Sequence, residues 1–582
     1  MRLFSYDMQK YLYRPLDKER QEIRLISLVG GQFDDTLRIS IHHYAFPSIS
    51  HDNEKILVAG ELQPNLPFPW EARETIDGRV IFQNRHTNQT SWTHPISNAE
   101  VSAAQRPADR PQYDALSYTW GNEENAETIQ VIEYESGEHC AELRGYQNLA
   151  LALRHLRYSD RTRTMWVDSI CINQEDILER NEQVTRMASI YKLATHVVVW
   201  LGVEESNSCH AIEVLQHIAD QIVLTKSGSL IRSPEAEFPN VWMNACCFTF
   251  DNRTWAALHT FVERAWFYRL WCWQEVNLGS RNALMQCGET VIPWSTLERA
   301  ILCLHNKEFL PSAEFRERCR HIALLYANSD SWSMSGMLDI SRSKGCKDPR
   351  DKIYGLLGLT APRFTSMITI DYSLPVEQIF KMTFLAHADC TKRLELLKHC
   401  GLADRTTEGP SWVPDWSKTD FTPPILSEQV STGLSRAHFK YLAPNILEVV
   451  GVECCSIQSV SDIAPRDIDK VLQTVRVWFN DLPKEDVYLN GQKMIEAFAL
   501  TIGMNRTGHR HPTNHFLSVY GFVDLLQQIL LMDENSMENP IYSDREVVNI
   551  VQKCKGRAFF TTEDGHIGTT VGGVETGKRI RD

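Results

Sequence analysis

Three patterns in the chain contain residue types that could do chemistry by themselves. Gly572–Lys578 (GGVETGK) has the GxxxxGK spacing of a phosphate-binding loop, but Arg579 stands where such loops carry the Ser/Thr that binds magnesium. His509, His511 and His515 lie close together in the sequence, among glycine and proline and without neighbouring cysteine or carboxylate ligands. A solvated loop is therefore favoured over a metal site. The fifteen cysteines show no CxxC spacing, which favours free thiols in a reducing compartment.

The segment from 113 to 202 alternates between strand-like and helix-like patterns. YDALSYTW (113–120), TMWVDSICI (164–172) and THVVVWLG (195–202) predict strands, the last of them apolar enough to be buried on both faces. Apolar residues at helical spacing predict helices over 148–157 and 179–194. This order predicts a parallel sheet with right-handed crossovers. Two further strands are predicted at 21–27 and 36–43, ahead of this segment.

Composition restricts the class of protein. The 582 residues contain 43% hydrophobic and 23% charged residues, as in an ordinary globular chain, and the length allows two to four domains. A net charge of −14 argues against nucleic-acid binding through phosphate contacts. The longest apolar run, near Val197–Leu201, is far shorter than a membrane span, and the first residues do not resemble a signal peptide. We therefore expect a cytoplasmic protein that binds neither nucleic acid nor membrane.

Residues 66–95 (LPFPWEARETIDGRVIFQNRHTNQTSWTHP) carry two tryptophans 22 residues apart, LPxxWE at the start, DGR in the first turn and WxxP at the end. This pattern resembles the WW domain, a small three-stranded sheet. Such a sheet is too small for a normal core and depends on an aromatic–proline clasp. The resemblance implies that the clasp consists of Trp70, Phe82 and Pro95, supported by Asn84 and Pro67.

The opposite face of a WW domain binds proline-rich peptides in an aromatic groove. By resemblance, the peptide-binding residues here are Ile81, Arg85, Thr90 and Trp92. Ile81 stands where the family usually has a tyrosine that stacks on the ligand, and Arg85 where it usually has a histidine. Two interpretations therefore remain open: a module that binds a proline-rich partner, and a module that only packs on its neighbour. SNAEVSAAQRPADRPQ (97–112) follows as a predicted linker.

Three longer blocks resemble the heterokaryon-incompatibility (HET) domain of filamentous fungi. They are YDALSYTWG (113–121), the unbroken stretch from Trp166 to Gly202, and RAWFYRLWCWQEV (264–276). DPRDKIYGLLGL (348–359), IDYS (370–373) and SWVPDWS (411–417) are typical companions in that family. The resemblance implies a role in incompatibility or regulated cell death. It also implies a fold related to Toll/interleukin-receptor (TIR) domains.

Enzymatic TIR domains cleave the nicotinamide–ribose bond of NAD with a glutamate in a setting similar to Trp271–Glu275 (WCWQE). Loss of nicotinamide leaves an oxocarbenium-like ribose, which a fixed carboxylate stabilises. The resemblance therefore implies that Glu275 is catalytic and that Tyr118, Trp120 and Asp168 bind the substrate at the carboxyl ends of the strands. NAD would be a substrate; no cofactor or metal is expected.

Structural roles for the same residues remain as alternatives. Glu275 can be an ion-pair partner of Arg264 or Arg269, and Asp168 can cap the NQED turn or pair with Arg180. Glu179 and Arg180 can be charges in the first turn of a helix. Tryptophans at apolar positions, namely 166, 200, 266 and 271, are more often core than part of a ligand site.

The sequence thus predicts an α/β protein with a TIR-like parallel sheet core flanked by helices, an inserted three-stranded all-β WW module, and a mixed α+β C-terminal region. The expected domains are 1–60 (N-terminal strands belonging to the core), 64–96 (WW), 97–112 (linker), 113–290 (HET) and 291–582 (C-terminal helices and strands). The expected function is an incompatibility or cell-death effector, and the sharper hypothesis adds NAD glycohydrolase activity that self-association switches on. The alternative is a non-enzymatic interaction protein that recruits partners through proline-rich peptides.

Overall fold

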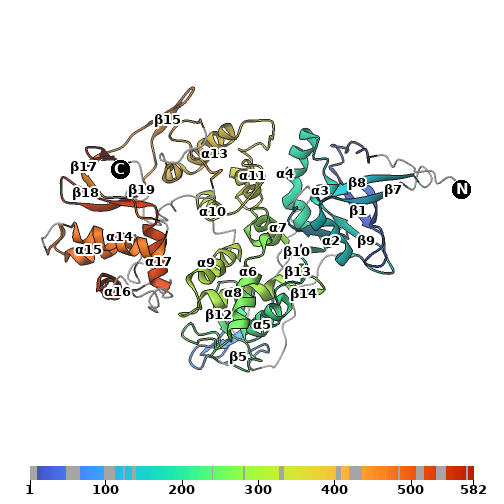
Figure 1. Ribbon diagram of the computed structural model, residues 1–582, viewed down its shortest axis with the longest axis horizontal. Coiled ribbons are helices and arrows are strands. Elements are labelled where there is room, and N and C mark those ends of the chain that lie inside the picture. The colour runs from blue at the N-terminus through green and yellow to red at the C-terminus, as the bar shows by residue number, and fades with distance from the viewer. Residues whose placement is uncertain are drawn as a thin grey trace. The chain divides into compact units, whose positions relative to one another are not determined.

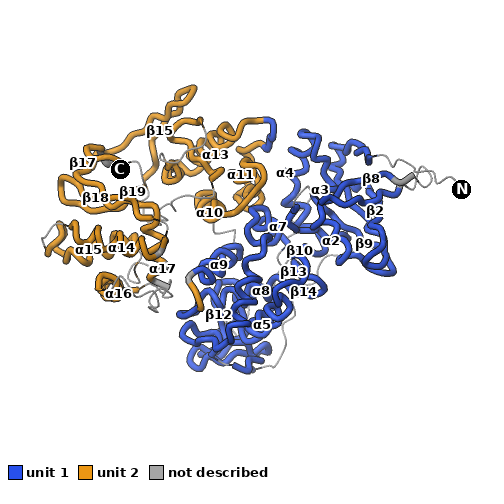
Figure 2. Tube along the Cα trace, in the orientation of Figure 1, with its two compact units in different colours: residues 1–310, 314–329, 370–373 blue, residues 311–313, 330–369, 374–582 orange. Residues whose placement is uncertain are grey.

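The computed structural model divides into two compact units, which Figure 2 distinguishes by colour. Unit 1 comprises residues 1–310, 314–329 and 370–373, and unit 2 comprises residues 311–313, 330–369 and 374–582. The structure describes residues 10–46, 66–96, 112–121, 125–133, 139–238, 240–279, 282–326, 333–401, 408–418, 435–465, 467–482, 486–505, 507, 517–531, 545–571 and 574–581. The predicted linker at 97–112 lies outside these ranges except for its last residue, and so do His509, His511 and His515.

Within the described part of unit 1, the largest sheet has nine strands in the order β14-β13-β10-β6-β9-β1-β2-β7-β8 (Figure 1). Their bounds are β1 Glu22–Leu28, β2 Arg38–Ala45, β6 Asp114–Ser117, β7 Glu127–Glu133, β8 His139–Gly145, β9 Arg163–Trp166, β10 His196–Trp200, β13 Ala283–Cys287 and β14 Thr290–Pro293. The predicted parallel arrangement is correct for β6, β9 and β10, and β13, which was not predicted, also pairs in parallel with β10. The full sheet is mixed, because β1 pairs antiparallel with both β9 and β2. The two N-terminal strands thus extend the same sheet as the strands beyond residue 113.

The helices of unit 1 follow the apolar periodicity of the sequence. Their bounds are α2 Gln147–Leu156, α3 Asp168–Cys171, α4 Ile177–Leu193, α5 Ser208–Asp220, α6 Asn252–Val262, η4 Ala265–Tyr268, α7 Cys272–Gly279, α8 Trp294–His305, α9 Ala313–Ala323 and η6 Leu324–Tyr326. α4 begins at a capping residue, Asp176, whose side chain accepts hydrogen bonds from the amides of Leu178 and Glu179. α4 packs against α7, and α5 packs against α6 and α8.

The predicted strand over 164–172 is wrong in its second half. β9 ends at Trp166, and Asp168–Cys171 form the short helix α3. Aspartate and serine are poor strand residues but favour the start of a helix, where they meet unpaired backbone N–H groups. This local preference outweighs the apolar pattern of Ile170 and Ile172, and it places Asp168 just past the carboxyl end of the strand.

Residues 70–91 form a separate three-stranded antiparallel sheet of β3 Trp70–Glu74, β4 Val80–Asn84 and β5 Thr90–Ser91. Phe82 is fully buried, and the Asn84 side chain accepts hydrogen bonds from the amides of His86 and Thr87, which fixes the second turn. We call residues 66–96 the small module. Its neighbour in unit 1 is the hairpin of β11 Ile222–Leu224 and β12 Leu230–Arg232.

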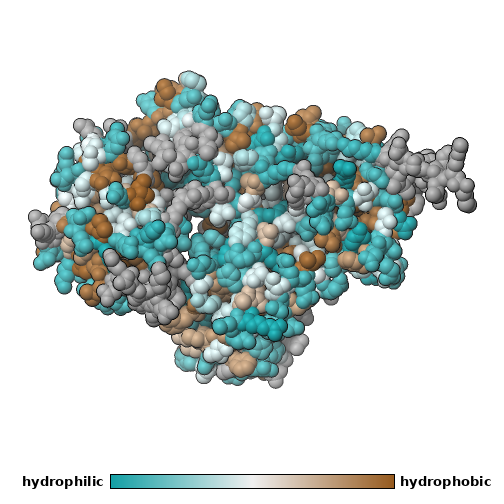
Figure 3. All heavy atoms as spheres, in the orientation of Figure 1, coloured by the Kyte–Doolittle hydropathy of each residue, from teal (hydrophilic) through white to brown (hydrophobic). Residues whose placement is uncertain are grey.

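Unit 2 contains helices followed by a smaller sheet. Its elements are α10 Met334–Ser341, α11 Asp351–Leu357, α12 Pro362–Thr365, α13 Val376–Thr391, η8 Glu395–His399, β15 Phe439–Leu442, β16 Ile446–Val449, β17 Glu453–Val460, α14 Ile468–Asn480, α15 Met494–Ile502, α16 Val519–Leu531, α17 Arg545–Cys554, β18 Arg557–Thr562, β19 Ile567–Val571 and β20 Arg579–Arg581. One apolar cluster joins α14, α15, α16 and α17 to β18. Val450 and Val452, which connect β16 to β17, are exposed apolar side chains. Figure 3 shows brown, hydrophobic residues scattered among hydrophilic ones on the face in view.

Candidate functional site

The predicted site residues meet at the carboxyl ends of two neighbouring parallel strands. Ser117 is the last residue of β6, and Asp168 follows the end of β9 by two residues. The loop after β6 carries Tyr118 and Trp120 back over this edge. The Tyr118 hydroxyl lies 2.6 Å from the Ser169 hydroxyl, and the Trp120 indole N–H donates to the Asp168 carboxylate at 2.9 Å. The structure therefore brings Tyr118, Trp120 and Asp168 together, as the carboxyl-end rule for open sheets predicts.

Glu275 lies beneath this loop and is sealed from solvent. It sits on α7, is 1% exposed, and accepts a hydrogen bond from the Ser117 hydroxyl. Ser117 in turn accepts a hydrogen bond from the indole N–H of Trp266 at 2.8 Å. Burial raises the pKa of Glu275, and nearby Asp168 raises it further, against the lowering effects of Arg269 and Ser117. Burial of the carboxyl group is the largest of these effects, so the net shift of its pKa is upward.

Arg269 supplies the positive charge of the cluster. Its Nη1 lies 3.5 Å from Glu275 Oε2, so the structural ion pair that the sequence left open is present. Burial alone would lower the pKa of Arg269, but Glu275 and Asp168 raise it. Burial also raises the pKa of Asp168, although Arg269, Trp120 and the Ser169 amide act against this. Two carboxyl groups therefore lie near one guanidinium, whose side chain is 19% exposed.

Arg264, the other arginine considered as a partner of Glu275, points elsewhere. It donates to the carbonyls of Leu201 and Val203 at 2.8 and 3.0 Å, beyond the end of β10. The tryptophans at 166, 200 and 266 are buried in the core, as expected from their apolar positions, whereas Trp271 is only partly buried. Ser117 and Trp266 were not predicted as site residues. Ser117 was visible only as the neighbour of Tyr118, and no local pattern marks Trp266.

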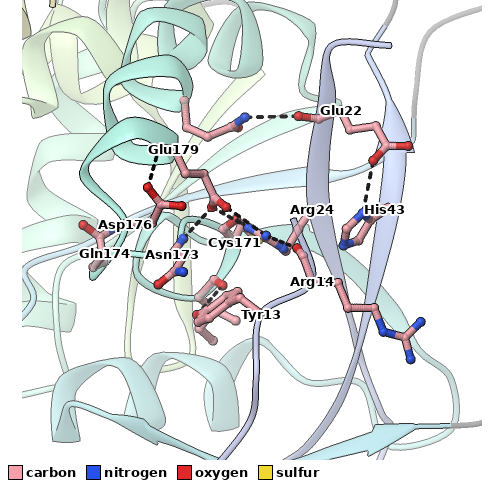
Figure 4. Close-up of polar contacts among 12 residues, drawn as sticks. Tyr13, Arg14, Glu22, Arg24, His43, Cys171, Asn173, Gln174, Asp176 and Glu179 are labelled. Atoms are coloured by element: carbon pink, nitrogen blue, oxygen red, sulfur yellow. Dashed lines mark hydrogen bonds and ion pairs between the residues drawn. The ribbon is translucent and has the colours of Figure 1, made fainter. Parts of the chain in front are cut away.

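A second buried charge cluster joins β1 to α4 (Figure 4). Arg24 is fully buried and binds the Glu179 carboxylate with both terminal nitrogens, at 2.5 and 3.0 Å. It also donates to the carbonyls of Cys171 and Arg14. Glu179 additionally accepts from the Asn173 amide at 2.7 Å. Glu179 is therefore not a surface charge of the first helical turn, because Arg24 draws it inward.

Residues Ile370–Ser373 (IDYS) also contact α4, although the chain on either side of them belongs to unit 2. The Asn181 side chain donates to Asp371 at 3.3 Å and accepts from the Tyr372 amide at 2.9 Å. The Arg180 guanidinium lies 3.5 Å from the centre of the Tyr372 ring, which is a cation–π contact. Arg180 thus holds this segment and does not pair with Asp168.

The residues assigned to peptide binding on the small module make contacts within unit 1. Ile81 is fully buried against Val223 and Ile231, and the Thr90 hydroxyl donates to the Arg232 carbonyl at 3.0 Å. The Arg79 guanidinium lies 3.8 Å from the centre of the Trp92 ring. Arg85 pairs with Glu71, whose carboxylate also pairs with Arg73.

A cavity of about 350 Å³ lies along the joint between the small module, the β11–β12 hairpin and α8. Its lining mixes apolar side chains with charged ones, among them Asp77, Arg79, Asp220, Glu235 and Arg299. Trp92 contributes to the wall, but such a mixed charged lining does not provide the paired aromatic surfaces that hold a polyproline helix. Among the described residues, no group of three or more His, Cys, Asp or Glu side chains is placed to hold a metal ion. No helix in the described part of the chain has the length and apolar character needed to cross a membrane.

Comparison with known proteins gives a family match and a match to a curated protein. The family described as heterokaryon incompatibility protein (HET) matches residues 113–275, from the residue before β6 to Glu275, which is the region that contains this site. The chain is also 28% identical over 375 residues to heterokaryon incompatibility protein 6, OR allele, of Neurospora crassa, and this alignment covers 53% of each chain. The chain therefore spans about half the length of this curated relative. No solved structure matches.

Proposed function

We propose that this chain is an effector of heterokaryon incompatibility that triggers cell death by cleaving NAD at the nicotinamide–ribose bond, with Glu275 as the catalytic carboxylate. The observation that carries the proposal is the meeting of Glu275, Asp168 and Arg269 at the carboxyl ends of β6 and β9. That edge is where open α/β sheets bind ligands. The matched family region supports the incompatibility role, because it ends at Glu275 and includes every other member of the cluster.

The residues suit the chemistry in distinct ways. Departure of nicotinamide leaves positive charge on the ribose, and an ionised Glu275 would stabilise that charge. Nicotinamide leaves as a neutral base from a cationic ring, so the reaction needs no strong general acid. Trp120 carries a broad aromatic surface at the edge of the site and is held in place by its hydrogen bond to Asp168. Arg269 would position both carboxylates.

The sealed state of Glu275 sets a condition on this activity. A substrate cannot touch a side chain that is 1% exposed, and burial raises the pKa of the carboxyl that the reaction requires in its ionised form. We propose that the described conformation is the resting one. Self-association would open the loop after β6, admit water and substrate, and lower the pKa of Glu275 by hydrating it.

The test is inducible expression of the wild-type protein and of Glu275→Gln in a fungal or yeast host, with NAD content and viability followed over time. Glutamine keeps the shape of the side chain and an oxygen that accepts the Ser117 hydrogen bond, but it removes the negative charge that faces Arg269. The abundance and melting temperature of Glu275→Gln are therefore measured beside wild type, and expression is adjusted so that the two proteins are compared at equal abundance. We expect rapid NAD loss and death with wild type and neither with Glu275→Gln.

The matched control is Glu289→Gln, because Glu289 is exposed and makes only a surface pair with His155. It should behave like wild type in both assays. If the wild-type protein kills cells without NAD loss, the incompatibility role stands and the proposed NAD cleavage is refuted. NAD loss that persists in Glu275→Gln at equal abundance would remove Glu275 as the catalytic residue.

A further inference from the structure

The small module meets the β11–β12 hairpin through two turns of the same kind. Thr75–Arg79 (TIDGR) closes the first hairpin of the module, and Thr225–Ser229 (TKSGS) closes β11–β12. In each turn the threonine amide donates to the carbonyl four residues on, at 2.9 and 3.0 Å. The glycine in each has a positive φ, +82° for Gly78 and +80° for Gly228, which glycine adopts without strain.

The two turns are bonded to each other reciprocally. Thr75 and Thr225 form an antiparallel bridge. The amide of Ile76 donates to the Leu224 carbonyl at 3.1 Å, and the amide of Lys226 donates to the Glu74 carbonyl at 2.8 Å. In both cases the residue after a threonine binds the residue before the other threonine. The Lys226 ammonium also pairs with the Glu74 carboxylate. The backbone groups of the two turns are thus hydrogen-bonded to each other, as buried backbone groups are in native structures.

An apolar contact closes the centre of the joint. Ile81, Val223 and Ile231 are buried together, with Trp92 packed at the border. A tyrosine at position 81, as the WW resemblance would place there, would carry a hydroxyl into this contact, and an unpaired buried hydroxyl costs about 1–3 kcal/mol. Isoleucine has no such group. The departure at Ile81 is thus explained by permanent burial under the hairpin.

The remaining polar and aromatic parts of the peptide-binding face are also occupied. Thr90 is bonded to the Arg232 carbonyl at the far end of the hairpin. The ring of Trp92, which would stack on a proline, is covered by the Arg79 guanidinium. Arg85 is held by Glu71 at the edge of the module. A polyproline ligand would have to displace the hairpin and Arg79 together.

We infer that the small module recognises a β-hairpin, through paired Thr-x-x-Gly turns, and that the hairpin it binds is β11–β12 of its own chain. Its interaction surface is thereby used inside unit 1, and the folded protein does not bind proline-rich peptides through this face. This inference is independent of NAD cleavage, because it concerns residues 66–96 and 222–232 alone.

Hydrogen exchange of the full-length chain, read at single-residue level, tests the inference. The amides of Ile76 and Lys226 should be protected together in the wild type. Val223→Asp places a charge in the apolar contact without changing the module, and we expect exchange at both amides to become more than about tenfold faster. The ladder between β3 and β4 should stay protected. Val291→Asp is the control, because Val291 is a half-exposed valine on β14, and it should leave both amides unchanged.

A second variant is used if Val223→Asp also disturbs the hydrogen bonds between β3 and β4. Lys226→Glu keeps the apolar contact but sets a carboxylate beside Glu74, and the same two amides should again exchange faster. In parallel, the wild-type protein is titrated with PxxP and PPxY peptides by fluorescence polarisation, where we expect no saturable signal. Binding that disappears in Trp92→Ala would overturn the inference. Exchange at Ile76 and Lys226 that is as fast in wild type as in the variants would overturn it as well.

Discussion

Arg24→Met is the change expected to destabilise unit 1 most clearly. Arg24 is fully buried and makes four hydrogen bonds, two to Glu179 and one each to the carbonyls of Cys171 and Arg14 (Figure 4). Methionine fills much of the same volume but provides no donor. It leaves the Glu179 carboxylate buried without a counterion, with the Asn173 amide as its remaining bond in this cluster. Removing one partner of a buried ion pair costs about 3–5 kcal/mol.

The two carbonyls that lose a donor add about 1 kcal/mol each if water does not replace it. We therefore expect Arg24→Met to lower the free energy of unfolding of unit 1 by about 5–7 kcal/mol. Glu179→Gln retains the shape but leaves Arg24 charged and buried, for a loss of about 3 kcal/mol. The double variant Arg24→Met/Glu179→Met removes both charges, so its cost should be well below the sum of the single changes.

The assay is the denaturant dependence of hydrogen exchange in β1 and α4, which reports on unit 1 separately from unit 2. Lys10→Met is the matched control. Its partner is Glu175 at 2.8 Å, but both side chains are exposed, and such surface pairs contribute about 0.2–1 kcal/mol. The reasoning fails if Arg24→Met lies within about 1 kcal/mol of wild type, or if the single costs add up in the double variant.

For three further substitutions, burial or tight packing decides whether the protein becomes more or less stable. Burial raises the pKa of Glu298 to about 8, so this group contributes stability that is present below about pH 4.5 and lost as the pH rises toward 8. Glu298→Gln should match wild type in urea unfolding at pH 5 and exceed it by a few kcal/mol at pH 8; an equal difference at both pH values would contradict this. A Cβ on Gly279 would lie 2.2 Å from Cγ2 of Val197 in β10, so Gly279→Ala should cost about 1–3 kcal/mol and lower the melting temperature, whereas Gly401→Ala, with open space around it, should not. Tyr372→Ala removes a buried ring and its cation–π contact with Arg180, so exchange in residues 370–373 should rise steeply.

The sequence was sufficient for those elements whose own pattern decides their conformation. The helix α4 was predicted over 179–194 from its apolar spacing, and β10 from an unbroken apolar run. The end of β9 was misjudged, because Asp168 and Ser169 start a helix within an apolar stretch. The hairpin β7–β8 was not predicted, since its alternation is weak and its partner strand β2 lies about 90 residues earlier.

The candidate site was likewise predicted only in part. The position of Asp168, Tyr118 and Trp120 at one edge followed from strand order, which the sequence carries. The contacts of Ser117 with Glu275 and Trp266 did not, because they join residues about 150 positions apart whose local patterns say nothing of each other. Arg24 was missed for the same reason: nothing in QEIRLIS distinguishes a buried arginine from an exposed one until Glu179 is brought opposite it. The hairpin that covers Ile81 is likewise separated from it by about 140 residues.

The burial of Glu275 links the proposed chemistry to its control. The same absence of water that would strengthen an ionised carboxylate's hold on a developing cation also raises the pKa of Glu275. A loop opening that admits NAD would hydrate the carboxyl and lower its pKa, so substrate access and the return of the pKa toward its ordinary value would come together. If Glu275 is the catalytic residue, the closed cluster of Ser117, Glu275 and Arg269 would restrain activity, and a trigger that separates Ser117 from α7 would release it.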